Sequence, residues 1–156
     1  MCFHWRLKLL VSTFNTNIMA YPEFMVAPMR KDLTEVGFNE LKTAEEVEQL
    51  LGNKSGTTLV VVNSVCGCAA ANARPAVKKA IQNSKKPVVL STVFAGMETE
   101  AVEKARAYML PYPPSSPAIA LFKDGQLVHM LERHHIEGRS ADMIAANLVE
   151  AFDQHC

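Results

Sequence analysis

The sequence has little of what marks a membrane protein, a nucleic-acid-binding protein or a small disulfide-stabilised domain. Its 16 Lys and Arg residues are balanced by 16 Asp and Glu residues, so no net positive charge is available for a nucleic-acid backbone. No apolar run approaches the ~18 residues that a membrane-spanning helix needs. The four cysteines among 156 residues are too few for the disulfide framework of a small secreted protein. We therefore expect no nucleic acid and no membrane among the partners, while the 49% of apolar residues can bury the core of one globular domain.

Residues 1–18 differ from the rest of the chain because they carry no regular pattern of apolar residues. The apolar stretch Leu7 to Val11 is interrupted by Lys8 and is not followed by a small-residue cleavage site, which disfavours a signal peptide. We interpret residues 1–18 as an N-terminal extension of uncertain order that precedes a start at Met19, and residues 19–156 as a single domain. Without a secretion signal, the expected location is the cytoplasm.

The spacing of apolar residues predicts alternating helices and strands. Helices are expected over residues 24–36, 43–51, 66–82, 98–109 and 140–152, and strands over residues 57–62, 88–94, 118–122 and 127–131. Asp124-Gly125 favours a tight turn, so the last two strands should form an antiparallel hairpin. A helix between the first two strands implies that they are parallel neighbours. The predicted fold class is therefore α/β, with a central mixed β-sheet flanked by helices on both faces.

Five residues predict where helices begin or break. Thr43 and Glu46 form the pattern of a capping box, and Ser140 can cap the last helix. Pro28 is expected to mark the start of the regular part of the first helix, since proline is favoured in a first helical turn. Pro75 lies inside an alanine-rich stretch and should kink or divide that helix, because proline removes a backbone donor.

Two cysteines lie two positions apart, at the junction between a predicted buried strand and a predicted helix. Free amides at the helix N-terminus favour an anion, so the Cys66 thiol should ionise readily, and only a thiolate attacks disulfides. Residues two apart on a regular helix point in different directions, so a Cys66–Cys68 disulfide requires a non-helical first turn, which Gly67 permits. So small a ring should be labile. We predict that the pair turns over, with Cys68 or a free thiol attacking a mixed disulfide formed at Cys66.

A lone Cys-x-Cys motif also fits two other interpretations. The cysteines can be small core residues, or they can belong to a metal site. The other candidate ligands are His134, His135, His155 and Cys156, and none of them stands at a recognisable ligand spacing. The strand-to-helix junction favours redox chemistry, so we predict no metal. The two adjacent histidines are expected in a surface loop, and Cys156 is expected to be exposed and reactive.

Several blocks of sequence, in order, resemble the bacilliredoxin family. The first is Val62-Asn63-Ser64-Val65-Cys66-Gly67-Cys68-Ala69, followed by Ala73-Arg74-Pro75, and it is similar to the family's active-site signature. The later blocks are Thr92-Val93-Phe94-Ala95-Gly96, Tyr112-Pro113-Pro114-Ser115-Ser116-Pro117, Phe122-Lys123-Asp124-Gly125, Glu132-Arg133-His134 and Ile136-Glu137-Gly138. The resemblance extends from about residue 21 to residue 156. Family members often have glycine just after the motif, where this chain has Ala70 and Ala71.

The resemblance implies a thioredoxin-like fold and the removal of bacillithiol from S-bacillithiolated proteins. Cys66 matches the family's nucleophile, and Cys68 matches its resolving cysteine. Bacillithiol is then a co-substrate and no cofactor is bound. The implied partners are bacillithiolated or disulfide-bonded client proteins and a low-molecular-weight thiol. Ser116 and Pro117 resemble the thioredoxin-type loop in which a cis-proline faces the active site, where the backbone could pair with an extended client segment.

Three further residues are candidates for substrate binding. Arg74 could contact carboxylates of bacillithiol, or it could be a solvated helix arginine. Asn63 and Ser64 could donate hydrogen bonds near the sulfur, or they could satisfy only local backbone groups. The predicted activity is that of a thiol–disulfide oxidoreductase of the bacilliredoxin type. The alternatives are a general oxidoreductase or disulfide isomerase without preference for bacillithiol, and a metal-binding thiol protein. The sequence assigns no oligomeric state.

Overall fold

The computed structural model describes residues 20–156, so the predicted extension 1–18 and Cys2 lie outside the described residues. The helices are α1 (Glu23–Thr34), α2 (Ala44–Leu51), the π-helical segment η1 (Ala69–Ala73), α3 (Arg74–Ala80), α4 (Thr99–Tyr108), α5 (Arg133–Ile136) and α6 (Ala141–His155). The strands are β1 (Asn39–Glu40), β2 (Thr57–Asn63), β3 (Val89–Phe94), β4 (Ala118–Lys123) and β5 (Gln126–Leu131). None of the helices within residues 20–156 is long and apolar enough to cross a membrane.

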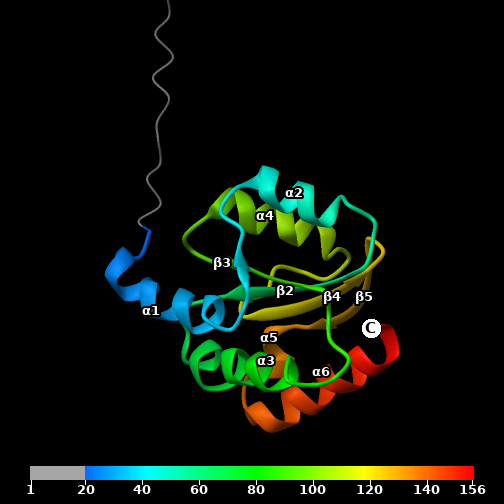
Figure 1. Ribbon diagram of the computed structural model, residues 1–156. Helices are drawn as coiled ribbons and strands as arrows, with labels where there is room; N and C mark the ends of the chain where they lie inside the picture. The colour runs from blue at the N-terminus through cyan, green and yellow to red at the C-terminus, as the bar shows by residue number, and fades with distance from the viewer. Residues whose placement is uncertain (1–19) are drawn as a thin grey trace, which may run out of the picture.

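The strands form one mixed sheet in the order β1-β3-β2-β4-β5. β1 and β2 each pair in parallel with β3, whereas β4 pairs antiparallel with both β2 and β5. Helices α2 and α4 cover one face of this sheet, and α3 and α6 cover the other (Figure 1). The predicted mixed sheet with helices on both faces is confirmed, and so is the C-terminal hairpin.

The central strand β2 separates two apolar cores. Successive side chains of a strand point to opposite faces. Leu59 and Val61 therefore pack among α3 and α6, whereas Val60 and Val62 pack among α2 and α4. All four side chains are fully buried, and burying each such side chain contributes roughly 1.5–3 kcal/mol. The strand is covered on both faces, as predicted, and it ends directly before the cysteine motif.

The helix signals are confirmed with one exception. The N–H of Glu46 donates to Thr43 Oγ1 at 3.2 Å and its carboxylate accepts from the Thr43 N–H at 3.1 Å, which completes the capping box of α2. Ser140 caps α6 by accepting a hydrogen bond from an amide in its first turn. The prediction for Pro28 is wrong, because α1 begins five residues earlier and runs through it. Pro28 removes only one backbone hydrogen bond, and the buried face of α1 holds the helix against the rest of the molecule.

Two short elements have no counterpart in the sequence analysis. The two-residue strand β1 pairs with β3 through Asn39↔Ser91 and Glu40↔Thr92. The four-residue helix α5 contains His134, at a place where a surface loop was expected. Neither element is long enough to show a period of two or of 3.6 residues, so apolar spacing carries no signal for them.

Candidate active site

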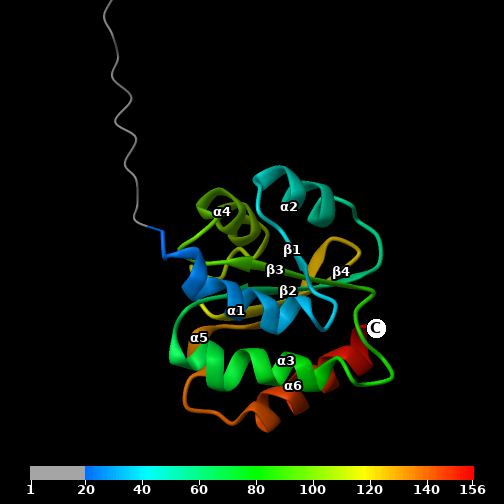
Figure 2. The ribbon, with the colours of Figure 1, turned by 60° about the vertical axis from the view of Figure 1, so that its left-hand side comes forward.

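The structure joins the two motif cysteines in a disulfide directly after β2. Cys66 precedes the helical turn that begins at Gly67, and its Cα lies 5.4 Å from the Cα of Cys68. Cys66 is partly exposed, whereas Cys68 is buried. A partner that approaches from solvent therefore reaches the Cys66 sulfur first. Figures 1 and 2 both place the connection from β2 to α3 at the opposite end of the sheet from the C-terminus.

The first turn of the helix differs from our expectation. Gly67 and Cys68 are helical, with φ −68° and ψ −28° at Cys68, and Gly67 does not adopt a positive φ. The prediction of a non-helical turn at Gly67 is wrong, because the residue outside the helix is Cys66 itself. The segment η1 follows and ends where Pro75 enters the first turn of α3, so the predicted division of this helix is confirmed.

Two hydrogen-bond donors point at the Cys66 sulfur. The backbone N–H of Ala69 and the hydroxyl of Ser64 each donate to Sγ over 3.3 Å. When the disulfide opens, these donors favour an anionic sulfur over a neutral thiol. The expected influence of the helix N-terminus therefore acts through one particular amide, that of Ala69. Among the candidates for substrate binding, Ser64 is the one that contacts the reacting atom.

Asn63 and Arg74 lie behind the motif and hold its backbone in place. Asn63 Oδ1 accepts hydrogen bonds from the N–H of Ser64 (2.9 Å) and from Arg74 Nη1 (3.0 Å), and its amide donates to the carbonyl of Met29 (3.1 Å). Arg74 Nη1 also donates to the carbonyl of Ser64 (3.2 Å). Both side chains are buried, Asn63 to 1% exposure and Arg74 to 5%. The interpretation of Arg74 as a solvated helix arginine is therefore wrong. Asn63 and Arg74 are positioning residues, because their contacts hold the backbone of the motif in place.

The carboxylate of Asp32 ties α1 to these positioning residues. It accepts hydrogen bonds from Arg74 Nε and from Lys78 Nζ, each over 3.0 Å. Burial alone would raise the pKa of Asp32, but the hydrogen bonds from Lys78 and Arg74 outweigh it and lower the pKa. The position of the cysteine motif therefore depends on contacts with α1 as well as on the end of β2.

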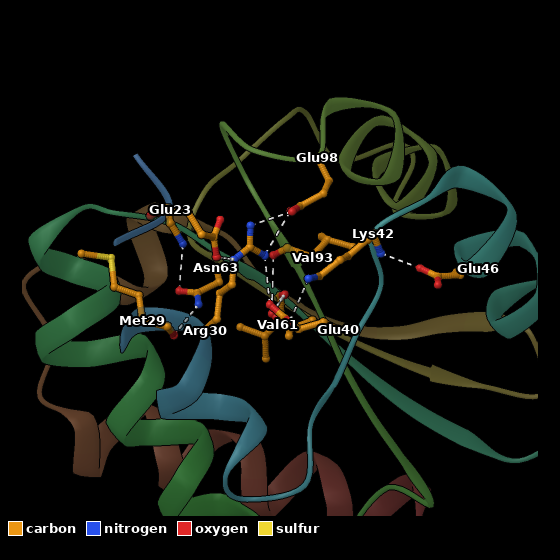
Figure 3. Close-up of polar contacts among 12 residues, drawn as sticks. Glu23, Met29, Arg30, Glu40, Lys42, Glu46, Val61, Asn63, Val93 and Glu98 are labelled. Carbon is orange, nitrogen blue, oxygen red and sulfur yellow. Dashed lines mark hydrogen bonds and ion pairs between the residues drawn. The ribbon is translucent and has the colours of Figure 1, made fainter. Parts of the chain in front are cut away.

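A second buried arginine fixes α1 against the edge of the sheet (Figure 3). Arg30 forms ion pairs with Glu40 in β1 (2.9 Å), with Glu98 before α4 (2.6 Å) and with Glu23 (3.3 Å). Burial alone would lower the pKa of Arg30, but its hydrogen bonds to Glu98 and Glu40 outweigh it and raise the pKa. This cluster was not predicted, although a charged residue within the apolar stripe of a predicted helix indicates a buried ion pair.

The proline-rich loop reaches the active site through Ser116 and Pro117. The Ser116–Pro117 peptide bond is cis, as the resemblance implies, and the Leu110–Pro111 bond is cis as well. Pro117 is buried, and Ser116 lines the same pocket as Cys66. The loop before β4 and the motif after β2 therefore meet at one end of the sheet.

The pocket beside Cys66 has a volume of about 330 Å³. Two of the predicted site residues, Ser64 and Ser116, line it together with Cys66. Six further residues line it that were not predicted as site residues, and three of these carry large polar side chains: Tyr21, Arg106 and Arg133. Gly96 in the β3–α4 connection has a φ of +87°, which residues with a side chain rarely adopt, and a Cβ there would also stand 2.9 Å from the Tyr21 ring.

Cys156 lies far from the motif, at the other end of β2. Its thiol forms a hydrogen bond with Thr57, the first residue of that strand. The seven residues of β2 separate it from Cys66 by roughly 20 Å. Burial of the thiol raises the pKa of Cys156, and the opposing effects of Thr57 and Lys123 are smaller. The residue is exposed, as predicted, but the raised pKa disfavours the predicted reactivity.

The side chains within residues 20–156 that lie close enough to share a metal ion are Glu132, His134 and His135. His135 Nδ1 already accepts a hydrogen bond from the Glu132 N–H over 3.1 Å. Burial lowers the pKa of His135, and the neighbouring His134 lowers it further. This group does not include Cys66 or Cys68, so it adds no ligand to the motif.

A partly exposed sulfur, a second sulfur bonded to it and two donors that favour its anion define a thiol–disulfide oxidoreductase. The fold is similar to that of a thioredoxin. A thioredoxin from Malassezia sympodialis superposes with a TM-score of 0.54 at 16% sequence identity, covering 76% of this chain and 90% of that one.

Comparisons of sequence narrow the class to one family. The family model described as disulphide isomerase matches residues 21–156. A bacilliredoxin from Cytophaga hutchinsonii is 62% identical over 134 residues, which cover 86% of this chain and 98% of that protein. A bacilliredoxin from Salinibacter ruber is 54% identical over 140 residues, which cover 88% of this chain and 82% of that protein. The chain therefore belongs to the bacilliredoxin family, and the predicted thioredoxin-like fold and oxidoreductase activity are confirmed.

Proposed function

We propose that the protein removes bacillithiol from S-bacillithiolated proteins, with Cys66 as the nucleophile and Cys68 as the resolving cysteine. The observation that carries the proposal is the environment of the Cys66 sulfur. It is partly exposed, it faces a pocket, and it receives hydrogen bonds from Ser64 and Ala69. The choice of bacillithiol comes from the name of the two relatives described above, both of which are bacilliredoxins.

The reaction consists of two exchanges between sulfur atoms. First, the Cys66 thiolate attacks the bacillithiol sulfur of a client–S–S–bacillithiol bond. The client leaves as a thiolate and takes a proton from solvent, while bacillithiol stays attached to Cys66. The Cys68 thiolate then attacks the Cys66 sulfur, which closes the Cys66–Cys68 disulfide and releases bacillithiol. Two electrons from free thiols reopen that disulfide, and free bacillithiol can also clear Cys66 directly by forming bacillithiol disulfide.

The client is proposed to approach along the loop that contains Ser116 and Pro117. Ser116 lines the pocket beside Cys66, so backbone groups of this loop stand next to the sulfur that attacks the mixed disulfide of the client. An extended client segment could pair with such exposed backbone groups. The electrons pass between sulfur atoms, so no bound cofactor is required. We place the cycle in the cytoplasm, where thiols are kept reduced.

The test follows a bacillithiol-capped client protein by mass spectrometry after the purified, reduced protein is added. Wild-type protein should release the client thiol. Cys66→Ala should abolish the transfer, and Cys68→Ala should retain the first exchange and accumulate bacillithiol on Cys66. Transfer by Cys66→Ala at the wild-type rate contradicts the assigned nucleophile, and absence of the adduct in Cys68→Ala contradicts the resolving role.

A general disulfide isomerase is the second candidate, because the matching family model carries that description. Both candidates begin with attack by Cys66, so the cysteine variants do not separate them. The same client capped with glutathione separates them. A clear preference for the bacillithiol cap supports the proposed function, and equal rates support the isomerase.

A further inference from the structure

Two arginines give the pocket beside Cys66 a positive charge. The thiol–disulfide exchange itself does not require that charge. Arg106 in the last turn of α4 and Arg133 at the start of α5 both line it, and no acidic side chain of the described residues does. The two arginines are 27 positions apart and come from different elements. Both therefore face the place where the group that Cys66 captures must lie.

Arg106 forms no salt bridge with another residue of the described part of the chain. Its Nε atom is buried without a hydrogen-bond partner among residues 20–156, and none of the salt bridges between those residues includes Arg106. Residues 1–19 contain no Asp or Glu that could supply a counter-ion. Burial lowers the pKa of Arg106, and the charge of Glu103 opposes this only in part. A partly buried guanidinium without a partner is costly, and an anion that enters the pocket removes that cost.

Arg133 stands at the rim of the pocket and is better satisfied. Its Nε lies 3.0 Å from Glu137 Oε2, and its backbone N–H donates to Ser115 Oγ over 2.7 Å. The second contact fixes the start of α5 beside the loop that contains Ser116. Arg133 therefore adds positive potential at a fixed place, whereas Arg106 offers the unused hydrogen-bond donors.

We propose that Arg106, assisted by Arg133, forms a carboxylate-binding subsite for the small thiol that becomes attached to Cys66. The inference rests on the proposed function and names what the pocket selects. A volume of about 330 Å³ suits part of a small molecule. The planar guanidinium binds a carboxylate through paired hydrogen bonds. The subsite holds the thiol in place after the first exchange, while the Cys68 sulfur attacks.

The test caps a single exposed cysteine of one client protein with three thiols. Mercaptosuccinate carries two carboxylates, mercaptoethanol is neutral, and cysteamine carries a positive charge. The client is the same throughout, so an acidic client side chain would affect all three substrates alike. The measured quantity is kcat/KM for release of each cap, expressed relative to mercaptoethanol. The wild-type protein should prefer mercaptosuccinate and disfavour cysteamine.

Arg106→Gln removes the positive charge of the guanidinium and its planar set of N–H donors. It should lower the mercaptosuccinate-to-mercaptoethanol ratio about tenfold, since charge-assisted hydrogen bonds to the carboxylate are lost from a site that is partly solvated. Arg133→Gln should lower the ratio less. Lys123→Gln is the matched control: it also removes one positive charge, but Lys123 pairs with the first residue of β2, at the far end from Cys66. It should leave the ratio at its wild-type value.

Failure of the proposed subsite and failure of the proposed function give different results in this test. An unchanged ratio in Arg106→Gln overturns the subsite while transfer continues, whereas no release of the bacillithiol cap by the wild-type protein, measured alongside, overturns the proposed function. If Arg106→Gln does not fold, inhibition of the wild-type protein by free compounds tests the subsite instead. Free succinate should then inhibit release of the mercaptoethanol cap, and its neutral analogue succinamide should not. Equal effects of the two compounds overturn the proposal.

Discussion

At the scale of single residues, the Cys66 sulfur receives two donors that differ in origin. The Ala69 N–H belongs to the backbone and is present whatever the side chain, whereas the Ser64 hydroxyl can be removed by substitution. Both lie 3.3 Å from the sulfur, so each contributes to the stability of its anion. Ser64 is the residue at which the nucleophile can be weakened without changing either cysteine.

Replacing Ser64 by Ala should slow the alkylation of Cys66 in the reduced protein. One donor to the anionic sulfur is lost, so the rate at pH 7 should fall about tenfold. Iodoacetamide labelling followed by peptide mass spectrometry measures it. Ser140→Ala is the control, because it removes a hydroxyl that caps α6 and should leave Cys66 labelling unchanged. Equal labelling rates in Ser64→Ala and wild type would show that the hydroxyl does not influence the sulfur.

At the scale of elements, the motif is held between β2, α3 and α1. Arg74 at the start of α3 reaches both Asn63 at the end of β2 and Asp32 on α1. The Arg30 ion pairs hold α1 against β1 and the start of α4. α1 is therefore part of the active-site support, although it carries neither cysteine.

Replacing Asp32 by Asn should destabilise the protein at neutral pH by about 1 kcal/mol, a modest effect because the carboxylate is partly solvated. The folded-state pKa of Asp32 is lowered, so its contribution is present above the unfolded pKa of about 3.9 and disappears as the pH falls through the folded pKa. Urea unfolding of both proteins at pH 7 and at pH 3 measures this. The difference should be smaller at pH 3, and a difference that grows on acidification would contradict the assignment.

At the scale of the whole molecule, the cysteine motif lies at one end of the sheet and Cys156 lies at the other. Cys156 contacts the first residue of β2, and the motif follows the last. The length of that strand keeps the two sites apart. Cys156 can therefore take no part in resolving a mixed disulfide within one molecule.

Replacing Cys156 by Ser should leave the rate of client release at its wild-type value. In a Cys66→Ser, Cys68→Ser protein, Cys156 should label slowly at pH 7 and faster as the pH rises, since burial raises its pKa and keeps the thiol protonated. Labelling rates across pH 7–10 measure this. Slow client release by Cys156→Ser, or fast labelling at pH 7, would contradict the position or the environment given to this thiol.

The parts of the fold that sequence predicts are those with local causes. The β-branched run of β2 and the Thr43–Glu46 capping box depend on neighbouring residues, and the structure contains both. The predicted helix start at Pro28 is wrong because tertiary packing outweighs a single lost hydrogen bond. The short elements β1 and α5 gave no periodic signal at all.

The residues of the candidate site also differ in whether the sequence predicts them. The motif and the blocks of the family resemblance identify Cys66, Cys68 and the cis-proline loop. Arg106 and Tyr21 join the pocket only because the fold brings distant segments together, and nothing in their sequence neighbourhood marks them. A charged residue among buried positions, as at Arg74, is the available signal, but on sequence alone it fits a contact with carboxylates of bacillithiol as well as a solvated side chain.

Strand β2 is hydrogen-bonded on both edges, to β3 and to β4, and is buried along its whole length. Its amides should therefore exchange with deuterium only when the entire molecule opens. The reactive sulfur is tethered directly to this slowest-exchanging segment. Catalysis should then persist in denaturant up to the same midpoint at which the circular dichroism signal disappears, instead of failing earlier through local fraying.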